Sequence, residues 1–506
     1  AVNGGGVYVA GYGTFKMGGI NKTPQVFGNY ITGKGAGVYA DGILELSGGV
    51  QILDNNGGDS SDIYLPGDKT IRITGKLINP KTIGITLENP PSVEGNNVVF
   101  AEGNNYQLTD DDTKAFFYND DYNWETYTVQ RDGKWLRMYR GEPHRHTVCD
   151  GSGCTDDSHG NVLFNALTYD ETGKTLKYGG MMQSASNGYY LLTQGNWYLT
   201  GNLELDAPIK IAGDVNLCLN GYSIILKADG NVIEIGVSGD VNAAKLTLCD
   251  CKQNGTAAGY GHITHGTGDS GKYTGRGVKL CAENTVFTMY GGKICDNQIV
   301  AANSTGAGVD VPAKTYFNMY GGEISGNTFT GTYGMGGGVY TAGTTSIGGN
   351  AKIFDNQVNV SGGKGGGIFA DDGAALYVSG NVQVTDNQDG YFDSQGGSNV
   401  YLKSAAIPIS VKGQLGNGAR IGVTLSDKAC PEDGETVIIA QTVPDTGESG
   451  TGWIQTGNFV SDYSRFYKLN VSDDGMAAKL ELHDHIWEAR SSSPENILKE
   501  RCTVGI

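Results

Sequence analysis

The sequence is short of proline, of basic residues and of long apolar runs. Proline accounts for 12 of 506 residues, and no Gly-X-Y period runs through the chain, which excludes collagen. No run of about eighteen apolar residues occurs, so we expect no membrane insertion. The formal net charge is −18, and such a surface repels nucleic acid. No convincing helical periodicity appears either, so the sequence predicts an all-β fold.

Cysteine is scarce as well, whereas glycine is abundant. The nine cysteines are too dispersed for a disulfide-dense scaffold, and their odd number leaves at least one unpaired within the chain. Glycine contributes 81 residues, roughly 16%, which is about twice its usual share. The chain begins inside a repeat, without Met or a basic leader. We therefore expect a piece of a larger protein.

A short phrase recurs at a period near thirty residues. "TMYGGKICDNQ" occupies 288–298, and "NMYGGEISGNT" occupies 318–328. Valine-led strands follow each other in steps of 31, 30 and 29 residues, at Val278, Val309, Val339 and Ile368. Asparagines close the repeats in steps of 30, 29 and 31 residues, at Asn297, Asn327, Asn356 and Asn387. Two independent landmarks with one period indicate a repeat architecture.

Within one repeat the apolar residues alternate, as Phe287 and Met289 do, which is typical of short strands. The pattern predicts a parallel β-helix with ~30 residues per coil, right-handed because parallel crossovers are. Met289 and Met319 should then stack inside, while Gly291 and Gly321 should occupy a corner at positive φ. The asparagines either form an amide ladder between coils or follow a simple turn preference.

A second, larger duplication divides the chain. Residues 6–65 match 338–402 element by element. We therefore predict four parts: the C-terminal part of a first module (1–140), a His/Cys-rich linker (141–165), a complete second module (166–482) and the start of another linker (483–506). The stretches 81–140 and 419–482 lose the period and carry Asp-Gly hairpin signals. Each should form a small β cap that covers an open coil end.

The first linker concentrates residues that bind zinc. "HRHTVCDGSGCTDDSH" contains His144, His146, Cys149, Cys154 and His159. A structural zinc ion takes four such ligands. A small disulfide between Cys149 and Cys154 is the alternative in a secreted protein, and free thiols are the third. With metal or disulfide, the linker would be a stiff joint between modules.

Aromatic residues recur at positions that face away from the predicted core. They are Tyr8, Tyr39, Tyr290, Tyr320, Tyr340 and Phe369. Exposed aromatic ladders offer flat faces to sugar rings or to a protein partner, whereas mutual stacking beneath overlying loops is the alternative. Asp371 and Asp372 are the nearest approach to a glycosidase carboxylate pair, and a solvated turn also explains them.

The chain resembles large repetitive cell-surface proteins of gut-dwelling Gram-positive bacteria. The resemblance rests on "NLCLNGYSI" (216–224), on the M-Y-G-G-x-I-x-x-N coils and on the His/Cys linkers. It implies a piece of a larger extracellular protein, secreted or held at the cell surface, that acts as an adhesin or binding module. Such a module recognises a host or dietary macromolecule, such as a glycan, a mucin glycoprotein or an immunoglobulin. Parallel β-helices also include glycoside hydrolases and polysaccharide lyases, so a carbohydrate-active enzyme is the second expectation.

Overall fold

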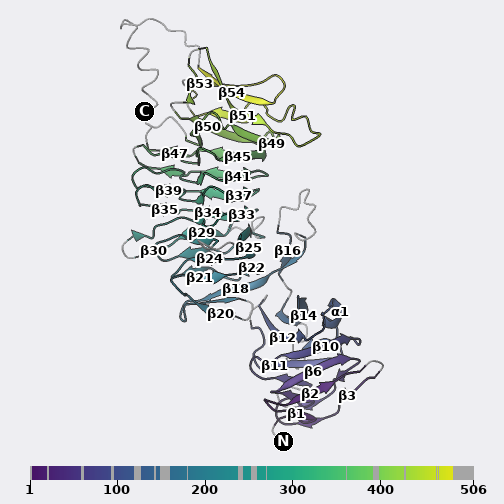
Figure 1. Ribbon diagram of the computed structural model, residues 1–506. Helices are drawn as coiled ribbons and strands as arrows, with labels where there is room; N and C mark the ends of the chain where they lie inside the picture. The colour runs from purple at the N-terminus through teal and green to yellow at the C-terminus, as the bar shows by residue number, and fades with distance from the viewer. Residues whose placement is uncertain are drawn as a thin grey trace, which may run out of the picture. The chain divides into compact units, whose positions relative to one another are not determined.

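The computed structural model forms two compact units built almost entirely from strands (Figure 1). Unit 1 comprises Ala1–His146, Asn161–Leu167 and Lys177–Met182, and unit 2 comprises Thr147–Gly160, Thr168–Leu176 and Gln183–Ile506. The structure describes residues 3–482 except 20–21, 58–61, 93–95, 119–126, 142–143, 149–159, 179–180, 237–242, 252–258, 269–270, 361, 391–397, 427–428, 433, 463 and 465–466. Within these residues, no helix is long and apolar enough to cross a membrane.

Unit 2 is a parallel β-helix, as predicted, whose coils each contribute strands to three parallel ladders. The first ladder contains β21 (Tyr190–Leu192), β24 (Ile209–Ile211), β27 (Ile233–Ile235), β32 (Val278–Leu280), β36 (Val309–Val311), β40 (Val339–Thr341), β44 (Ile368–Ala370) and β48 (Val400–Leu402). The second contains β22 (Gly195–Leu199), β25 (Asp214–Cys218), β28 (Lys245–Cys249), β33 (Val286–Met289), β37 (Tyr316–Met319), β41 (Thr344–Ile347), β45 (Ala375–Gly380) and β49 (Ile409–Leu415).

The third ladder of unit 2 lies next along each coil. It contains β23 (Leu203–Leu205), β26 (Ile224–Leu226), β29 (His262–His265), β34 (Lys293–Cys295), β38 (Glu323–Ser325), β42 (Lys352–Phe354), β46 (Gln383–Thr385) and β50 (Arg420–Leu425). A short fourth sheet follows it, made of β35 (Gln298–Ile299), β39 (Thr328–Phe329), β43 (Gln357–Val358) and β47 (Gln388–Asp389). A small antiparallel pair, β30 (Thr267–Gly268) and β31 (Gly271–Lys272), projects from one coil.

The core of unit 2 is a set of identical positions stacked coil upon coil. Val278, Val309, Val339 and Ile368 are partners in one register and are at most 1% exposed. Met289 and Met319 are likewise paired and fully buried. These observations confirm the predicted inward stacks. Burying such a side chain contributes ~1.5–3 kcal/mol, so each coil is stabilised mainly by its neighbours.

The repeat asparagines form a buried amide ladder, which was one of the two predicted alternatives. Asn297, Asn327, Asn356 and Asn387 are all 0% exposed. Each side-chain Nδ2 donates to the Oδ1 of the next member at 2.9–3.0 Å, ending on Asn399. Each backbone N–H donates to the same oxygen at 3.0–3.1 Å. The ladder therefore satisfies polar groups at a corner that no strand pairing covers.

The corners differ from the sequence prediction at two glycines. Positive φ belongs to Gly292 (87°) and Gly322 (80°), each one residue after the predicted Gly291 and Gly321. The earlier glycine has another role, because a Cβ on Gly321 would meet the carbonyl oxygen of Tyr290 at 2.4 Å. The residue before each ladder asparagine also has positive φ, at Asp296, Gly326, Asp355 and Asp386. Asp and Gly tolerate this conformation better than most residues.

An antiparallel cap closes the far end of unit 2, later in the chain than predicted. β50 still pairs in parallel with β46 and β48, although the sequence assigned 419–482 to the cap. The cap itself comprises β51 (Thr436–Thr442) paired antiparallel with β54 (Ala477–Leu482), which forms a hairpin with β53 (Tyr467–Val471). β52 (Phe459–Ser461) extends the parallel ladder beyond β50. The last coil thus loses the sequence period before it loses the coil geometry.

Unit 1 repeats this architecture with fewer coils. One parallel ladder contains β1 (Val7–Val9), β5 (Val38–Ala40), β9 (Ile63–Leu65), β11 (Ile83–Leu87) and β13 (Phe116–Tyr118). A second contains β2 (Thr14–Met17), β6 (Ile43–Gly48), β10 (Ile71–Leu77) and β12 (Asn97–Gly103). β3 (Gln25–Val26) pairs with β7 (Gln51–Ile52), and β4 (Tyr30–Ile31) with β8 (Asn56–Gly57). β11 pairs in parallel with β9, and β12 pairs in parallel with β10, so the coils of unit 1 also continue past residue 81.

The remaining elements of unit 1 close its coil stack and lead out of it. The antiparallel hairpin of β14 (Tyr127–Asp132) and β15 (Trp135–Arg140) packs beside β12 as the predicted cap. One helical turn, α1 (Asp110–Thr113), precedes it. β16 (Arg145–His146) and β17 (Val162–Leu163) form a short antiparallel pair. Along the chain there follow β18 (Asn165–Asp170), β19 (Thr175–Tyr178) and β20 (Met181–Ser184). The predicted boundaries of modules and linkers stay a prediction, and 483–506 lies outside the described residues.

Candidate functional site

Unit 1 carries three aromatic rings stacked across successive coils. Tyr8 and Tyr39 stack with ring centroids 5.2 Å apart and planes 8° apart. Tyr39 and Tyr64 continue the stack at 5.4 Å and 18°. The spacing approaches the distance between neighbouring strands, because all three residues occupy one register position. The sequence predicted the first two members and missed Tyr64, although Tyr64 lies in the duplicated phrase "DIYL".

Unit 2 carries the same stack at the equivalent coils. Tyr340 and Phe369 stack at 5.8 Å, and Phe369 and Tyr401 at 5.2 Å, with planes 15° apart in both pairs. Tyr401 is the equivalent of Tyr64 and was also missed. We call Tyr8–Tyr39–Tyr64 and Tyr340–Phe369–Tyr401 the aromatic rows.

Charged residues flank both aromatic rows in the same way. A lysine lies near the third ring, with Lys34 Nζ 4.6 Å from the Tyr64 centroid and Lys364 Nζ 5.8 Å from that of Tyr401. An aspartate follows the second ring by two residues and pairs with a lysine from the next coil. This ion pair joins Lys69 to Asp41 at 3.3 Å in unit 1, and Lys403 to Asp371 at 2.6 Å in unit 2.

The two rows differ in how far they reach solvent. Tyr8 is 54% exposed, and Tyr39 and Tyr340 are half-buried. Phe369 is only 2% exposed and Tyr401 8%, so the outward-facing position predicted for Phe369 is covered. Parallel stacking also hides ring faces from solvent and leaves mainly ring edges. The rows therefore present edges and charged groups, rather than the flat faces that the sequence suggested.

Hydrogen bonds from its neighbours stabilise the ionised form of Asp371. Its Oδ2 accepts from the Tyr340 hydroxyl at 2.5 Å, and its Oδ1 accepts from Lys403 Nζ and from the Asp372 backbone N–H. Burial alone would raise the pKa of Asp371, but these hydrogen bonds together lower it below the usual range. Burial also raises the pKa of Tyr340. A carboxyl held ionised is poorly suited to act as the general acid of a glycosidase.

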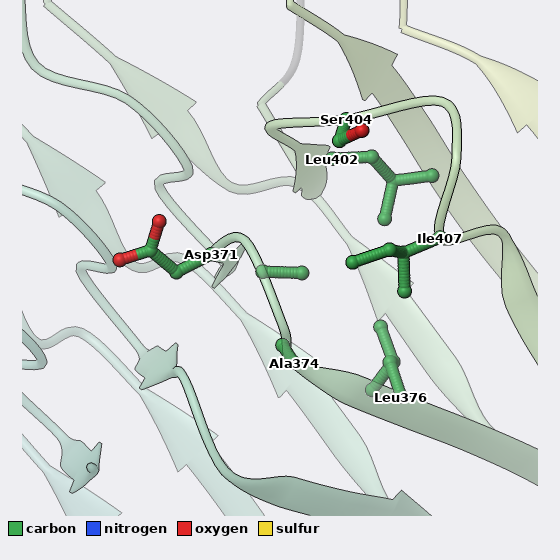
Figure 2. A pocket seen from close by; sticks show the side chains of 7 residues that line it. Asp371, Ala374, Leu376, Leu402, Ser404 and Ile407 are labelled. Atoms are coloured by element: carbon green, nitrogen blue, oxygen red, sulfur yellow. The ribbon is translucent and has the colours of Figure 1, made fainter. Parts of the chain in front are cut away.

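A small cavity beside Asp371 has an apolar lining. Its volume is about 10 Å³, and it is lined by Ala370, Asp371, Ala374, Leu376, Leu402, Ser404 and Ile407. Figure 2 shows that the Leu376, Leu402 and Ile407 side chains converge, while the Asp371 carboxylate points away from them. A space of this size accommodates about one water-sized group. It is too small to enclose a sugar ring.

The other predicted aromatic pair also stacks in unit 2. Tyr290 and Tyr320 lie 5.5 Å apart with planes inclined by 28°, and both are half-buried. They follow β33 and β37 at the corner where Gly292 and Gly322 turn the chain. Burial raises the pKa of Tyr320. This pair therefore belongs to the second ladder, whereas the aromatic row of unit 2 lies on the first.

Two of the five residues predicted to bind zinc lie together in unit 1. The rings of His144 and His146 are 4.9 Å apart, centroid to centroid. Cys149, Cys154 and His159, the rest of the predicted set, lie outside the described residues. The predicted Cys149–Cys154 disulfide therefore stays a prediction.

Local contacts hold the two histidines in unit 1 and a cysteine-bearing turn in unit 2. The His146 ring stacks on Phe164 with centroids 4.3 Å apart, and His144 meets His146 edge-on. Cys218 ends β25, and Cys251 lies in the turn after β28. Asp250 holds that turn, because its carboxylate accepts from the backbone N–H groups of Gly221 at 2.8 Å and Gly261 at 2.6 Å.

The described cysteines form no disulfides with one another; they are Cys218, Cys249, Cys251, Cys281, Cys295 and Cys430. Burial raises the pKa of the Cys218 and Cys295 thiols, and that of Cys281 to about 11. Cys295 and Cys249 pack as small apolar residues, as expected for buried thiols.

Comparisons with known proteins add no relative to this picture. No family model matches the chain, and neither a curated protein nor a solved structure matches it.

Proposed function

We propose that the chain is a surface-displayed binding module that recognises a host or dietary macromolecule through its aromatic rows. The observation that carries the proposal is the recurrence of one constellation in both units: three stacked rings, a lysine near the third ring and an Asp–Lys pair beside the second. The resemblance to repetitive bacterial surface proteins adds to it.

The fold itself does not require rings at these positions. On earlier coils of unit 2, the same register position is occupied by Lys210, Glu234, Lys279 and Asp310. Charged residues therefore satisfy the outward side of this ladder as well as rings do. Retention of rings, lysine and aspartate in both units is more economically explained by a shared binding role than by coil stability.

The chemistry of the rows favours a polyhydroxylated or glycosylated ligand. Ring edges, tyrosine hydroxyls, ammonium groups and carboxylates offer donors and acceptors along one line. Aromatic edges supply apolar contact between these polar groups. Because two rows occur in one chain, a ligand with repeated epitopes gains avidity when it engages both.

The proposal is tested with the whole chain on a glycan array, beside mucin and immunoglobulin. Tyr8→Ala and Tyr340→Ala should each weaken binding of a retained ligand, and the double variant should weaken it further. Tyr333→Ala, which removes an exposed tyrosine outside the rows, is the matched control and should bind as the parent does. Unchanged binding of the double variant would refute the rows as the site. Release of new reducing ends or unsaturated sugars would instead favour the carbohydrate-active enzyme.

We further propose that His144 and His146, together with the other linker residues predicted to bind zinc, hold a zinc ion. Imidazoles and thiolates are the common donors of structural zinc. Elemental analysis of the purified chain should find zinc, and His146→Ala should lose it. Cys281→Ser, which changes a cysteine outside the linker, should keep it. A chain without zinc after zinc loading and removal of excess metal would contradict this assignment.

A further inference from the structure

The outer face of the second ladder in unit 2 carries no charge over four successive coils. Its strands there are β33, β37, β41 and β45, and none of them contains Asp, Glu, Lys, Arg or His. The outward side chains at the centre of this face share one register and are half-buried; they are Thr288, Asn318, Ser346 and Tyr377. We call the outer face of these four strands the uncharged face.

The rest of the surface around the uncharged face is charged. On the same four coils, the third ladder presents one outward register made of Lys293, Glu323, Lys352 and Gln383. Charged residues also return at both ends of the second ladder. Lys245 lies 3.8 Å from Asp214 at one end, and Lys412 Nζ lies 4.5 Å from the centroid of the Tyr377 ring at the other. The absence of charge is therefore a bounded feature, which the coil itself does not impose.

An aromatic ring projects from the uncharged face. Tyr316 is 40% exposed, and its partners in the register are Val286 on one coil and Thr344 on the next. Neither partner carries a ring, so Tyr316 is not stacked between rings of adjacent coils as the members of the aromatic rows are. Its ring surface is therefore open to an apolar sugar face. The stacked pair of Tyr290 and Tyr320 borders the same face at the other end of the strands.

We propose that the uncharged face binds an extended, uncharged polysaccharide whose chain crosses successive coils. A charged ligand would lose hydration here without meeting an opposite charge, which costs free energy. The hydroxyl and amide groups of Thr288, Asn318 and Ser346 offer donors and acceptors that match sugar hydroxyls. Small side chains at these positions leave the ring of Tyr316 accessible beside them.

The repetition of the face suits a polymer better than a single sugar. Neighbouring strands lie about 4.8 Å apart, so four strands span about 14 Å along the coil axis. A ligand with repeating units meets the same kind of group again on each coil, and several weak contacts add up. The aromatic rows lie in unit 1 and on the first ladder of unit 2, so this inference names a second site and does not rest on the rows.

The test measures binding of the full chain to immobilised polysaccharides. Cellulose and mannan are the uncharged probes, and polygalacturonate is the charged counterpart. The chain should bind an uncharged probe more tightly than polygalacturonate, and added salt should not weaken that binding. Tyr316→Ala should weaken it roughly two- to tenfold. Tyr333→Ala, which removes an exposed tyrosine outside the face, should bind as the parent does.

A second variant adds a charge to the face. Thr288→Lys should weaken binding by more than about tenfold, because the ligand would cover an ammonium group that has no partner. Lysine is tolerated at outward positions of the other ladders, as at Lys279 and Lys293, so the variant should melt as the parent does. Thr385→Lys, which adds the same charge to the third ladder, is the matched control and should bind as the parent does.

Four results would overturn the inference. A parent chain that binds no uncharged probe, or that binds polygalacturonate more tightly, would exclude the proposed ligand. Equal binding by the folded Thr288→Lys variant and the parent would exclude the uncharged face as the site. Loss of immunoglobulin binding but of no polysaccharide binding in that variant would assign the face to a protein partner. None of these variants changes an aromatic row, so failure of this face and failure of the rows give different results.

Discussion

Replacing Asn356 with alanine removes a central member of the asparagine ladder. Its Oδ1 accepts from Asn327 at the backbone N–H (3.1 Å) and at Nδ2 (2.9 Å). Its Nδ2 donates to the carbonyl oxygens of Ile324 and Phe354 and to Asn387 Oδ1, at 2.9–3.0 Å. The alanine variant therefore leaves the buried backbone N–H of Asn327 without its acceptor, whereas Asn327 Nδ2 keeps the carbonyl oxygens of Ile294 and Ser325. A buried donor left without a partner costs ~1–3 kcal/mol, so we expect a local loss of about that size.

Hydrogen exchange measured by mass spectrometry is the suitable assay, because coils of a solenoid open locally. At about 1.4 kcal/mol per tenfold, amides of β38–β39 and β42–β43 should exchange roughly five- to a hundredfold faster. Asn359→Ala is the matched control: its side chain is exposed and makes one hydrogen bond, to Gln357 at 3.0 Å. Its exchange should stay within a few-fold of the parent chain.

The aspartate variant at the same position sharpens the test. Asn356→Asp keeps the acceptor for Asn327 but turns a carboxylate oxygen toward the three acceptors that Nδ2 now serves. It should destabilise most at neutral pH and recover as the carboxyl is protonated. If the alanine variant exchanged like the parent, or if the aspartate variant showed no dependence on pH, the ladder would not stabilise the coils as argued.

Two further predictions concern an asparagine ladder in unit 1 and the coil corners. In unit 1, Asn29 donates to Asn55 Oδ1 at 2.8 Å from Nδ2 and at 3.2 Å from the backbone N–H, and Asn55 donates to Asp62 Oδ1 at 2.9–3.0 Å. Burial raises the pKa of Asp62 to about 6 despite these bonds. Because the folded pKa lies above the unfolded value of ~3.9, stability should fall as pH rises from about 4 to above 6, by at most ~3 kcal/mol. Asp62→Asn, which reproduces Asn399 of unit 2, should abolish this dependence in urea titrations, and a parent chain with no loss over that range would contradict it. Gly322→Val should destabilise its coil far more than Gly373→Val. Both glycines have positive φ, but only at Gly322 would an added Cβ lie 2.6 Å from a backbone oxygen. Equal melting temperatures of the two variants would show that this close approach does not limit the side chain at Gly322.

The sequence alone determined the architecture because a parallel β-helix repeats its contacts. Each coil meets a nearly identical coil, so the residues that stack must recur at the coil period. The positions of Val309, Met319 and Asn327 could therefore be assigned from their recurrence, and each lies where that recurrence placed it. The antiparallel caps were foreseeable from the Asp-Gly hairpin signals in the segments that lose the period, although β11, β12, β50 and β52 in those segments still pair in parallel.

Features that depend on a single neighbour were decided only by the tertiary structure. Two adjacent glycines look alike in sequence, and the corner geometry assigns positive φ to Gly322 while packing holds Gly321 against a carbonyl. Phe369 occupies an outward position, yet its burial depends on what covers it and not on the strand that carries it. No spacing rule links Asn399 to Asp462, because residues so far apart in the chain form their hydrogen bonds only through folding. Periodicity specifies which residues stack, and only the folded chain specifies which side chains meet across the turns.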